Sequence, residues 1–224
     1  MKKGLTEIVY ILDRSGSMGG LEADTIGGFN AMIKKQKKAE GQAIVSTVLF
    51  DDEYEVLHNR IDIKDVPKMT DKQYFVRGCT ALLDAVGTAV NHIKKVHKDL
   101  PKYERPEKTI FVITTDGMEN ASYEYSYESI KKLIEKQQKK DGWEFMFIGA
   151  NIDSYAEAGR LGIKKSRTAN YVHDELGTST VYKGMAKAVC SVMMAPSLDA
   201  VDECLEESGW DVEITADFAE RGGR

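Results

Sequence analysis

The chain has 224 residues, 42% of them hydrophobic, which is enough to bury a substantial core in one globular domain. Its 31 basic and 36 acidic residues give a formal net charge of −5, which argues against nucleic acid or an anionic membrane as a partner. The apolar runs are too short to span a bilayer, and the N-terminus shows no export signal. The three cysteines lack metal-ligand spacing, so we expect reduced thiols in a cytoplasmic protein.

The chain opens with a strand followed by a helix. Residues 6–12, "TEIVYIL", form a nearly continuous apolar run, which is typical of a strand buried on both faces of a parallel sheet. Residues 21–39 then carry apolar side chains at helical spacing, and the lysines of "KKQKK" complement the dipole in the last turn.

The same alternation continues to about residue 194. We predict buried strands at 43–50, 108–115 and 143–150, a more exposed edge strand within 51–63, and helices at 80–98, 126–140 and 175–194. Alternating strands and helices indicate a parallel sheet with helices on both faces, which binds its ligands at the carboxyl ends of the strands. The acidic stretch 196–224, with Trp210 and Phe218 as its main apolar residues, is interpreted as an appendage or a loose tail.

Small oxygen-bearing side chains follow the first strand. The segment "ILDRSGSMGG" places Asp13, Ser15 and Ser17 at alternate positions, so their side chains point the same way if the chain stays extended. A loop that caps the following helix would also explain this triplet.

Two further junctions reach the same edge of the predicted sheet. "RGCTALLDAV" places Thr80 at the start of a helix, and "ITTDGMENAS" places Asp116 at the end of a buried strand. Taken singly, Thr80 is a helix N-cap and Asp116 a turn residue. Together with the first triplet they supply five hard-oxygen side chains, which suit a small hard cation such as Mg²⁺.

The segments "DRSGS", "GCTAL" and "TDGMEN" resemble, in this order, the metal-ion-dependent adhesion site of von Willebrand factor type A domains. The likeness covers residues 4–195 and implies a Rossmann-like fold, with a doubly wound, mostly parallel sheet, one antiparallel edge strand and helices on both faces. It implies that Ser15, Ser17 and Thr80 bind the metal directly or switch to water-mediated contact, whereas Asp13 and Asp116 act largely through water.

The resemblance also implies a function. The metal would be Mg²⁺, with Mn²⁺ or Ca²⁺ as alternatives, and a Glu or Asp carboxylate of a protein partner would complete its coordination. Because neutral hydroxyls compensate the charge of the ion poorly, an incoming anion is attracted. We therefore expect a protein-interaction module without enzymatic activity, working in an intracellular multiprotein assembly.

The alternative is a metal-dependent phosphoryl-transfer hydrolase on a similar fold. Such enzymes of the haloacid dehalogenase type need a second aspartate two residues after the first, and here that position is Ser15. The chain has neither a G-x-S-x-G elbow nor a P-loop. Its histidines stand in no recognisable triad context: His58, His92, His97 and His173.

Further residues are candidates for a partner-binding rim around this site. The loop after Asp116 carries Tyr123, Tyr125 and Tyr127, and the end of the strand at 143–150 is followed by Asn151 and Asp153. The tyrosines could instead pack on a neighbouring loop, and Asp153 could cap a helix.

Overall fold

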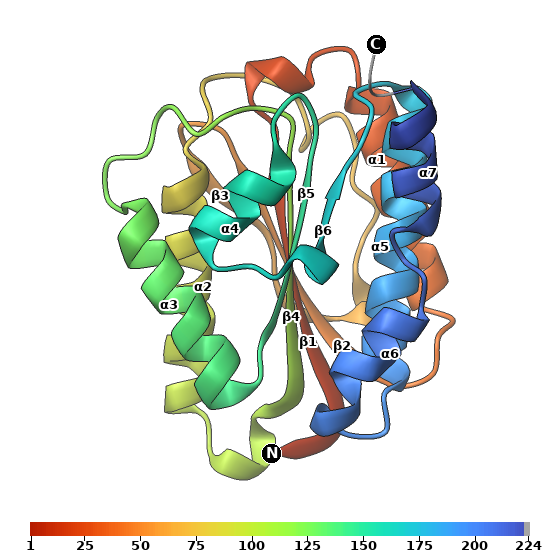
Figure 1. Ribbon diagram of the computed structural model, residues 1–224. Coiled ribbons are helices and arrows are strands. Elements are labelled where there is room, and N and C mark those ends of the chain that lie inside the picture. Colours follow the sequence, from red (N-terminus) through yellow and green to blue (C-terminus); the bar gives the residue numbers. More distant parts are fainter. Residues whose placement is uncertain (222–224) are drawn as a thin grey trace.

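The computed structural model describes residues 1–221, which form a central sheet between two layers of helices (Figure 1). The sheet has six strands in the order β3-β2-β1-β4-β5-β6. Only β3 runs antiparallel to its neighbour; the other pairs are parallel. The strands are β1 (Lys2–Asp13), β2 (Gln42–Phe50), β3 (Tyr54–Asp62), β4 (Pro106–Thr115), β5 (Glu144–Gly149) and β6 (Thr168–Asn170). This architecture confirms the predicted fold class.

Helices cover both faces of the sheet. One face packs against α1 (Glu22–Gln36), α5 (Glu175–Met194), α6 (Val201–Glu207) and α7 (Val212–Arg221). The other face packs against α2 (Leu82–Asp99), α3 (Tyr127–Asp141) and α4 (Ser154–Leu161). Short 3₁₀ helices occupy Gly16–Met18, Ile63–Asp65, Lys102–Glu104, Lys165–Arg167 and Leu198–Ala200. Among residues 1–221, no helix combines the length and apolarity that a membrane-spanning segment needs.

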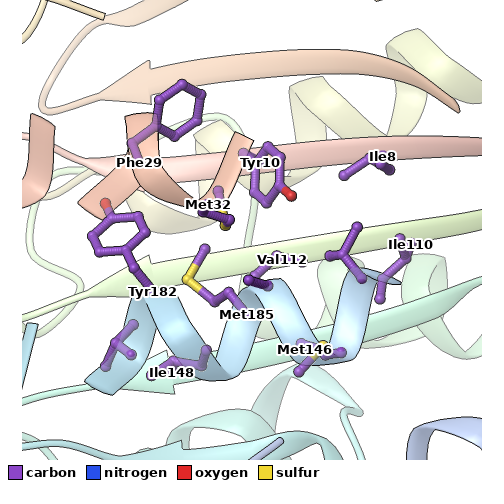
Figure 2. Packing of buried hydrophobic residues seen from close by; sticks show 14 of the residues in the cluster. Ile8, Tyr10, Phe29, Met32, Ile110, Val112, Met146, Ile148, Tyr182 and Met185 are labelled. Carbon is purple, nitrogen blue, oxygen red and sulfur yellow. The ribbon is translucent and has the colours of Figure 1, made fainter. Parts of the chain in front are cut away.

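The central strands are apolar on both sides because each side faces a helical layer. In β1, Ile8 and Tyr10 belong to the core beneath α1 and α5, whereas Val9 and Ile11 belong to the core beneath α2 and α3. Figure 2 shows the first of these cores, where side chains from α1 and α5 meet those of β1, β4 and β5. The continuous apolar runs in the sequence therefore mark strands buried on two faces.

The structure adds elements that the sequence patterns did not predict. The helix α4 and the strand β6 follow β5; neither was among the predicted elements, although the capping interpretation of Asp153 implied a helix directly after it. The segment after Pro196 is ordered as α6 and α7 through residue 221, with Trp210 and Ile214 buried against Gly184 of α5. Phe218, expected to anchor this segment, is only half-buried. Residues 222–224 of the predicted tail lie outside the described residues.

Both edges of the sheet are irregular or short. The pairing of β3 with β2 shifts register between Val45 and Thr47 and again between Thr47 and Val48. Within β3, Arg60 adopts a left-handed backbone conformation with φ of 53°. At the other edge β6 has three residues. The wide, regular part of the sheet is therefore its centre, where β1 and β4 lie side by side.

Candidate metal centre

The five candidate metal-binding residues lie at the carboxyl edge of the sheet. Asp13 is the last residue of β1, and Asp116 directly follows β4, the neighbouring parallel strand. After β1 the next strands, β2 and β3, are added on one side of it, whereas β4, β5 and β6 are added on the other side. The two aspartates therefore lie between β1 and β4, where the direction of strand addition reverses. Ligands of doubly wound sheets bind at such a switch point.

Hydrogen bonds join the serines to the aspartates. Ser17 Oγ donates to Asp116 Oδ1 at 2.6 Å, and the hydroxyls of Ser15 and Ser17 lie 3.0 Å apart. Asp13 Oδ1 accepts the backbone N–H of Ser15 at 2.7 Å, which turns the loop back over the end of β1. The structure thus brings Asp13, Ser15, Ser17 and Asp116 into one cluster.

Thr80 reaches the same cluster from the start of α2. A Cβ at Gly117 would lie 3.2 Å from both Ser17 Oγ and Thr80 Oγ1, so these hydroxyls flank one small gap that the glycine leaves open. The Thr80 side chain does not cap α2, because that helix has Ala81 at its N-cap position with no side-chain cap bond. Glu119 Oε2 accepts the backbone N–H of Leu83 in the first turn instead.

The two carboxyl groups are almost fully buried. Burial raises the pKa of Asp13 to about 6, against the lowering effect of hydrogen bonds from Thr115 and Ser15, and the nearby Asp116 raises it further. Burial likewise raises the pKa of Asp116. His173 Nε2 lies 2.8 Å from Asp116 Oδ2, and this contact lowers the pKa of Asp116 against the larger effect of burial. Two buried carboxylates whose negative charges are incompletely compensated favour a bound cation.

The donor set suits a hard divalent ion. Within residues 1–221, no three His, Cys, Asp or Glu side chains come together as a metal site, so hydroxyl oxygens must contribute here. Mg²⁺ accepts oxygen ligands and keeps several waters, which suits a cluster of two carboxylates and three hydroxyls. Ser15, Ser17 and Thr80 could therefore hold such an ion, while Asp13 and Asp116 balance its charge.

Several supporting residues were missed by the sequence interpretation. Thr115 Oγ1 donates to Asp13 Oδ2 at 2.6 Å, and Tyr74 donates its hydroxyl to the backbone oxygen of Asp13 at 2.6 Å. Asn120 Oδ1 accepts the backbone N–H of Thr80 at 2.9 Å. Thr115 and Asn120 flank Asp116 in the sequence, which was the available signal, but Tyr74 lies on a distant loop.

The candidate rim residues divide into exposed and packed side chains. Tyr123 is 85% exposed, and Met118, in the same loop between β4 and α3, is 69% exposed. Tyr125 packs against α2, where its hydroxyl accepts from Asn91 Nδ2 at 3.1 Å. Tyr127 donates its hydroxyl to Glu157 and lies under the Arg160 guanidinium. Of the three tyrosines, Tyr123 alone presents most of its ring to solvent.

The two candidate residues after β5 have different roles. Asp153 is the N-cap of α4, and its side chain accepts the backbone N–H of Ala156 at 3.0 Å, as the capping interpretation predicts. Asn151 is exposed and has a left-handed backbone with φ of 57°. Neither residue makes a hydrogen bond to the five clustered oxygen-bearing residues in the described structure.

Comparison with solved structures shows that the fold is that of von Willebrand factor type A domains. One similar structure is that of proximal thread matrix protein 1 from the mussel byssus, solved with zinc in its metal-ion-dependent adhesion site (MIDAS) motif. It matches with a TM-score of 0.58 at 17% identity, over 84% of this chain and 46% of its own. A von Willebrand factor type A protein from Catenulispora acidiphila matches with a TM-score of 0.58 at 13% identity over 85% of this chain and 43% of its own.

A third similar structure is manganese-loaded TRAP protein from Plasmodium vivax, with a TM-score of 0.57 at 17% identity over 80% of this chain and 73% of its own. Identities this low show a shared fold and no more. The chain spans less than half the length of the mussel and Catenulispora proteins. No protein-family profile matches the sequence, and no curated protein is significantly similar to it.

Proposed function

We propose that this chain is a metal-dependent protein-interaction module. Ser15, Ser17 and Thr80 hold a divalent cation, with Mg²⁺ as the ion and Mn²⁺ or Ca²⁺ as substitutes, while Asp13 and Asp116 act largely through water. An acidic side chain of a protein partner completes the coordination, within an intracellular assembly. The observation that carries the proposal is the convergence of Ser17 and Thr80 hydroxyls on the gap beside Gly117, next to the buried Asp116.

The arrangement of polar groups supports binding rather than catalysis. Ser17, Asp116 and His173 form a chain of contacts, but Asp116 stands in the middle, with the hydroxyl on one side and the imidazole on the other. In a catalytic triad the imidazole must stand between the two to accept the serine proton. Here the Ser17 hydroxyl donates its hydrogen bond to one oxygen of the Asp116 carboxylate, and the imidazole lies beside the other oxygen. We therefore propose that the hydroxyl serves as a ligand.

Calorimetric titration with Mg²⁺ and with Mn²⁺ tests the metal site. We expect saturable binding of one ion per chain, lost in Asp13→Ala because the buried carboxylate that balances the ion is removed. Asp199→Ala removes an exposed aspartate of the C-terminal segment and serves as the control, with unchanged binding expected. Identical titrations of wild type and Asp13→Ala would refute the proposed site.

Affinity capture from cell extract, with Mg²⁺ or with chelator, tests the interaction. We expect specific partners to be retained only with metal and to be lost from Ser15→Ala and Thr80→Ala proteins. Replacing the contacting acidic residue of such a partner by its amide should abolish binding, because an amide does not balance the ion. Partners retained in chelator, or metal-dependent phosphatase turnover that disappears in Asp116→Ala, would contradict the proposal.

A further inference from the structure

A buried ion cluster lies beside the candidate metal centre. Asp51 directly follows β2, and its carboxylate is completely buried. Its Oδ2 accepts hydrogen bonds from Arg14 Nε at 3.1 Å and from Arg77 Nε at 2.6 Å. A single carboxylate oxygen therefore joins two guanidinium groups from different loops.

The two arginines belong to the loops that carry the metal-binding hydroxyls. Arg14 lies between Asp13 and Ser15, and Arg77 precedes Thr80 by three residues. The backbone links the same loops, because Arg77 N–H donates to the Arg14 oxygen at 3.0 Å and Gly16 N–H to the Gly78 oxygen at 3.2 Å. Asp51 thus contacts one arginine from each of the two loops, and these loops must keep a fixed spacing for their hydroxyls to hold an ion.

Backbone bonds attach both loops to the end of β2 as well. Arg14 N–H donates to the Phe50 oxygen at 2.8 Å, and Ala81 N–H donates to the Asp51 oxygen at 2.8 Å. Asp51 Oδ1 is held in turn by the backbone N–H of Glu53 at 2.6 Å, which fixes the orientation of the carboxylate. The end of β2 is therefore the common support for Ser15 and Thr80.

Charge gives Asp51 a second effect on the site. The Arg14 side chain is completely buried, and its other acidic partner, Glu55, is half exposed. Without the Asp51 carboxylate, Arg14 would keep an incompletely compensated positive charge next to the candidate ligands, which would repel a divalent cation. Loss of Asp51 would therefore weaken metal binding through both geometry and charge.

We infer that Asp51 is a positioning residue that sets the metal affinity of this site by joining the loops of Ser15 and Thr80 through Arg14 and Arg77. This inference rests on the proposed function, since it concerns the affinity of the same site. Residues that orient metal ligands from outside the coordination shell commonly change metal affinity about 10- to 100-fold when they are mutated. We expect an effect of that size for Asp51→Asn, which keeps the shape of the side chain and removes its charge.

The test is Mn²⁺ titration of the full chain by calorimetry, together with thermal unfolding of the metal-free protein. The matched control is Glu7→Gln in β1, because Glu7 is also a completely buried carboxylate, bound to Arg60 at 2.6 Å and to His97 at 2.7 Å. It lies six residues before Asp13, about 20 Å along the strand. We expect both variants to lose thermal stability, but only Asp51→Asn to lose Mn²⁺ affinity.

Arg77→Gln provides a second variant, because this side chain is 38% exposed and Arg14 still holds Asp51 without it. Because the loss of this positive charge by itself favours a cation, a decrease in Mn²⁺ affinity in this variant reports on the position of the loops, and we expect a decrease of about threefold, smaller than for Asp51→Asn. If Asp51→Asn does not fold, the Mn²⁺ affinity of Arg77→Gln tests the inference in its place. Wild-type affinity in these variants, or an equal loss in Glu7→Gln, would overturn the inference. A wild-type protein that binds no Mn²⁺ would instead refute the proposed function.

Discussion

The ring of Tyr125 lies directly against Gly87 of α2, so close that a Cβ at position 87 would come within 2.6 Å of it. This contact anchors the loop that follows Asp116 to the helix that begins beside Thr80. A side chain expected at the rim of the site therefore supports the loop from below.

Gly87→Ala should destabilise the protein for this reason. Alanine favours a helix over glycine by about 1 kcal/mol, but the forced shift of the ring costs about 1–3 kcal/mol. The control is Gly27→Ala in α1, where a Cβ meets nothing within 4 Å and the helix preference acts alone. Chemical denaturation should give opposite signs for the two variants, and a stabilised Gly87→Ala protein would contradict the packing.

The metal-free protein should respond to pH through Asp13. Burial raises the pKa of this carboxyl from 3.8 to about 6, so its protonated form favours folding. The ionised group costs about 3 kcal/mol above pH 6, and this cost disappears as the pH falls toward 4. Asp13→Asn should therefore be more stable than wild type at pH 7, with the difference closing below pH 6.

The same pair of proteins should reverse order in saturating Mg²⁺. Metal stabilises only the protein that binds it, so wild type should gain unfolding temperature at pH 7 and Asp13→Asn should not. That gain should fade as the pH falls through 6, because protons then compete for the carboxyl group. Thermal unfolding with and without Mg²⁺ at several pH values measures both effects, and equal responses of the two proteins would contradict the assignment.

A buried lysine should be essential for the end of α5. Lys108 Nζ donates to the backbone oxygens of Met193 at 3.0 Å and Ala195 at 2.7 Å, and burial lowers the pKa of its amine. Lys108→Met removes the donor from these carbonyls, and we expect a loss of about 2–4 kcal/mol in unfolding free energy. Lys187→Met in the same helix breaks only a surface ion pair with Glu213 and should cost less than about 1 kcal/mol.

The C-terminal helices should unfold together with the rest of the chain. We propose a domain at residues 4–195 and an acidic appendage after it, and α7 buries Ile214 against α5. Ile214→Ala should cost about 2–4 kcal/mol of the single unfolding transition, whereas Val212→Ala, exposed on the same helix, should cost little. Equal stability of the two variants would mean that the appendage does not contribute to the cooperative unit.

Local sequence patterns were sufficient to predict the central strands of the sheet and the edge at which they end. The runs at β1, β2, β4 and β5 are apolar on both sides because two helical layers cover them, and their order implies a common carboxyl edge. Asp13 and Asp116 could therefore be expected to lie near each other although 103 residues separate them. Patterns two or three residues long carry no such signal, and β6, with three residues, was missed.

The supporting contacts could not be predicted in the same way. Asp51 falls in the segment 51–63, for which only an edge strand was predicted, and its partners Arg14 and Arg77 lie 37 and 26 residues away in the sequence. Tyr125 depends similarly on Gly87 and Asn91 of α2. Such contacts arise only after the loops have met in space, so no single segment reveals them.

The irregular edges of the sheet restrict how another molecule can approach. Strand addition and amyloid-like stacking need a long, flat row of free backbone groups. The register shifts and the left-handed Arg60 distort one edge, and three residues make up the other. A strand of another molecule therefore finds no long row of backbone groups to pair with at either edge of the sheet. Another protein would have to contact side chains instead, and further strands are discouraged from adding to the sheet.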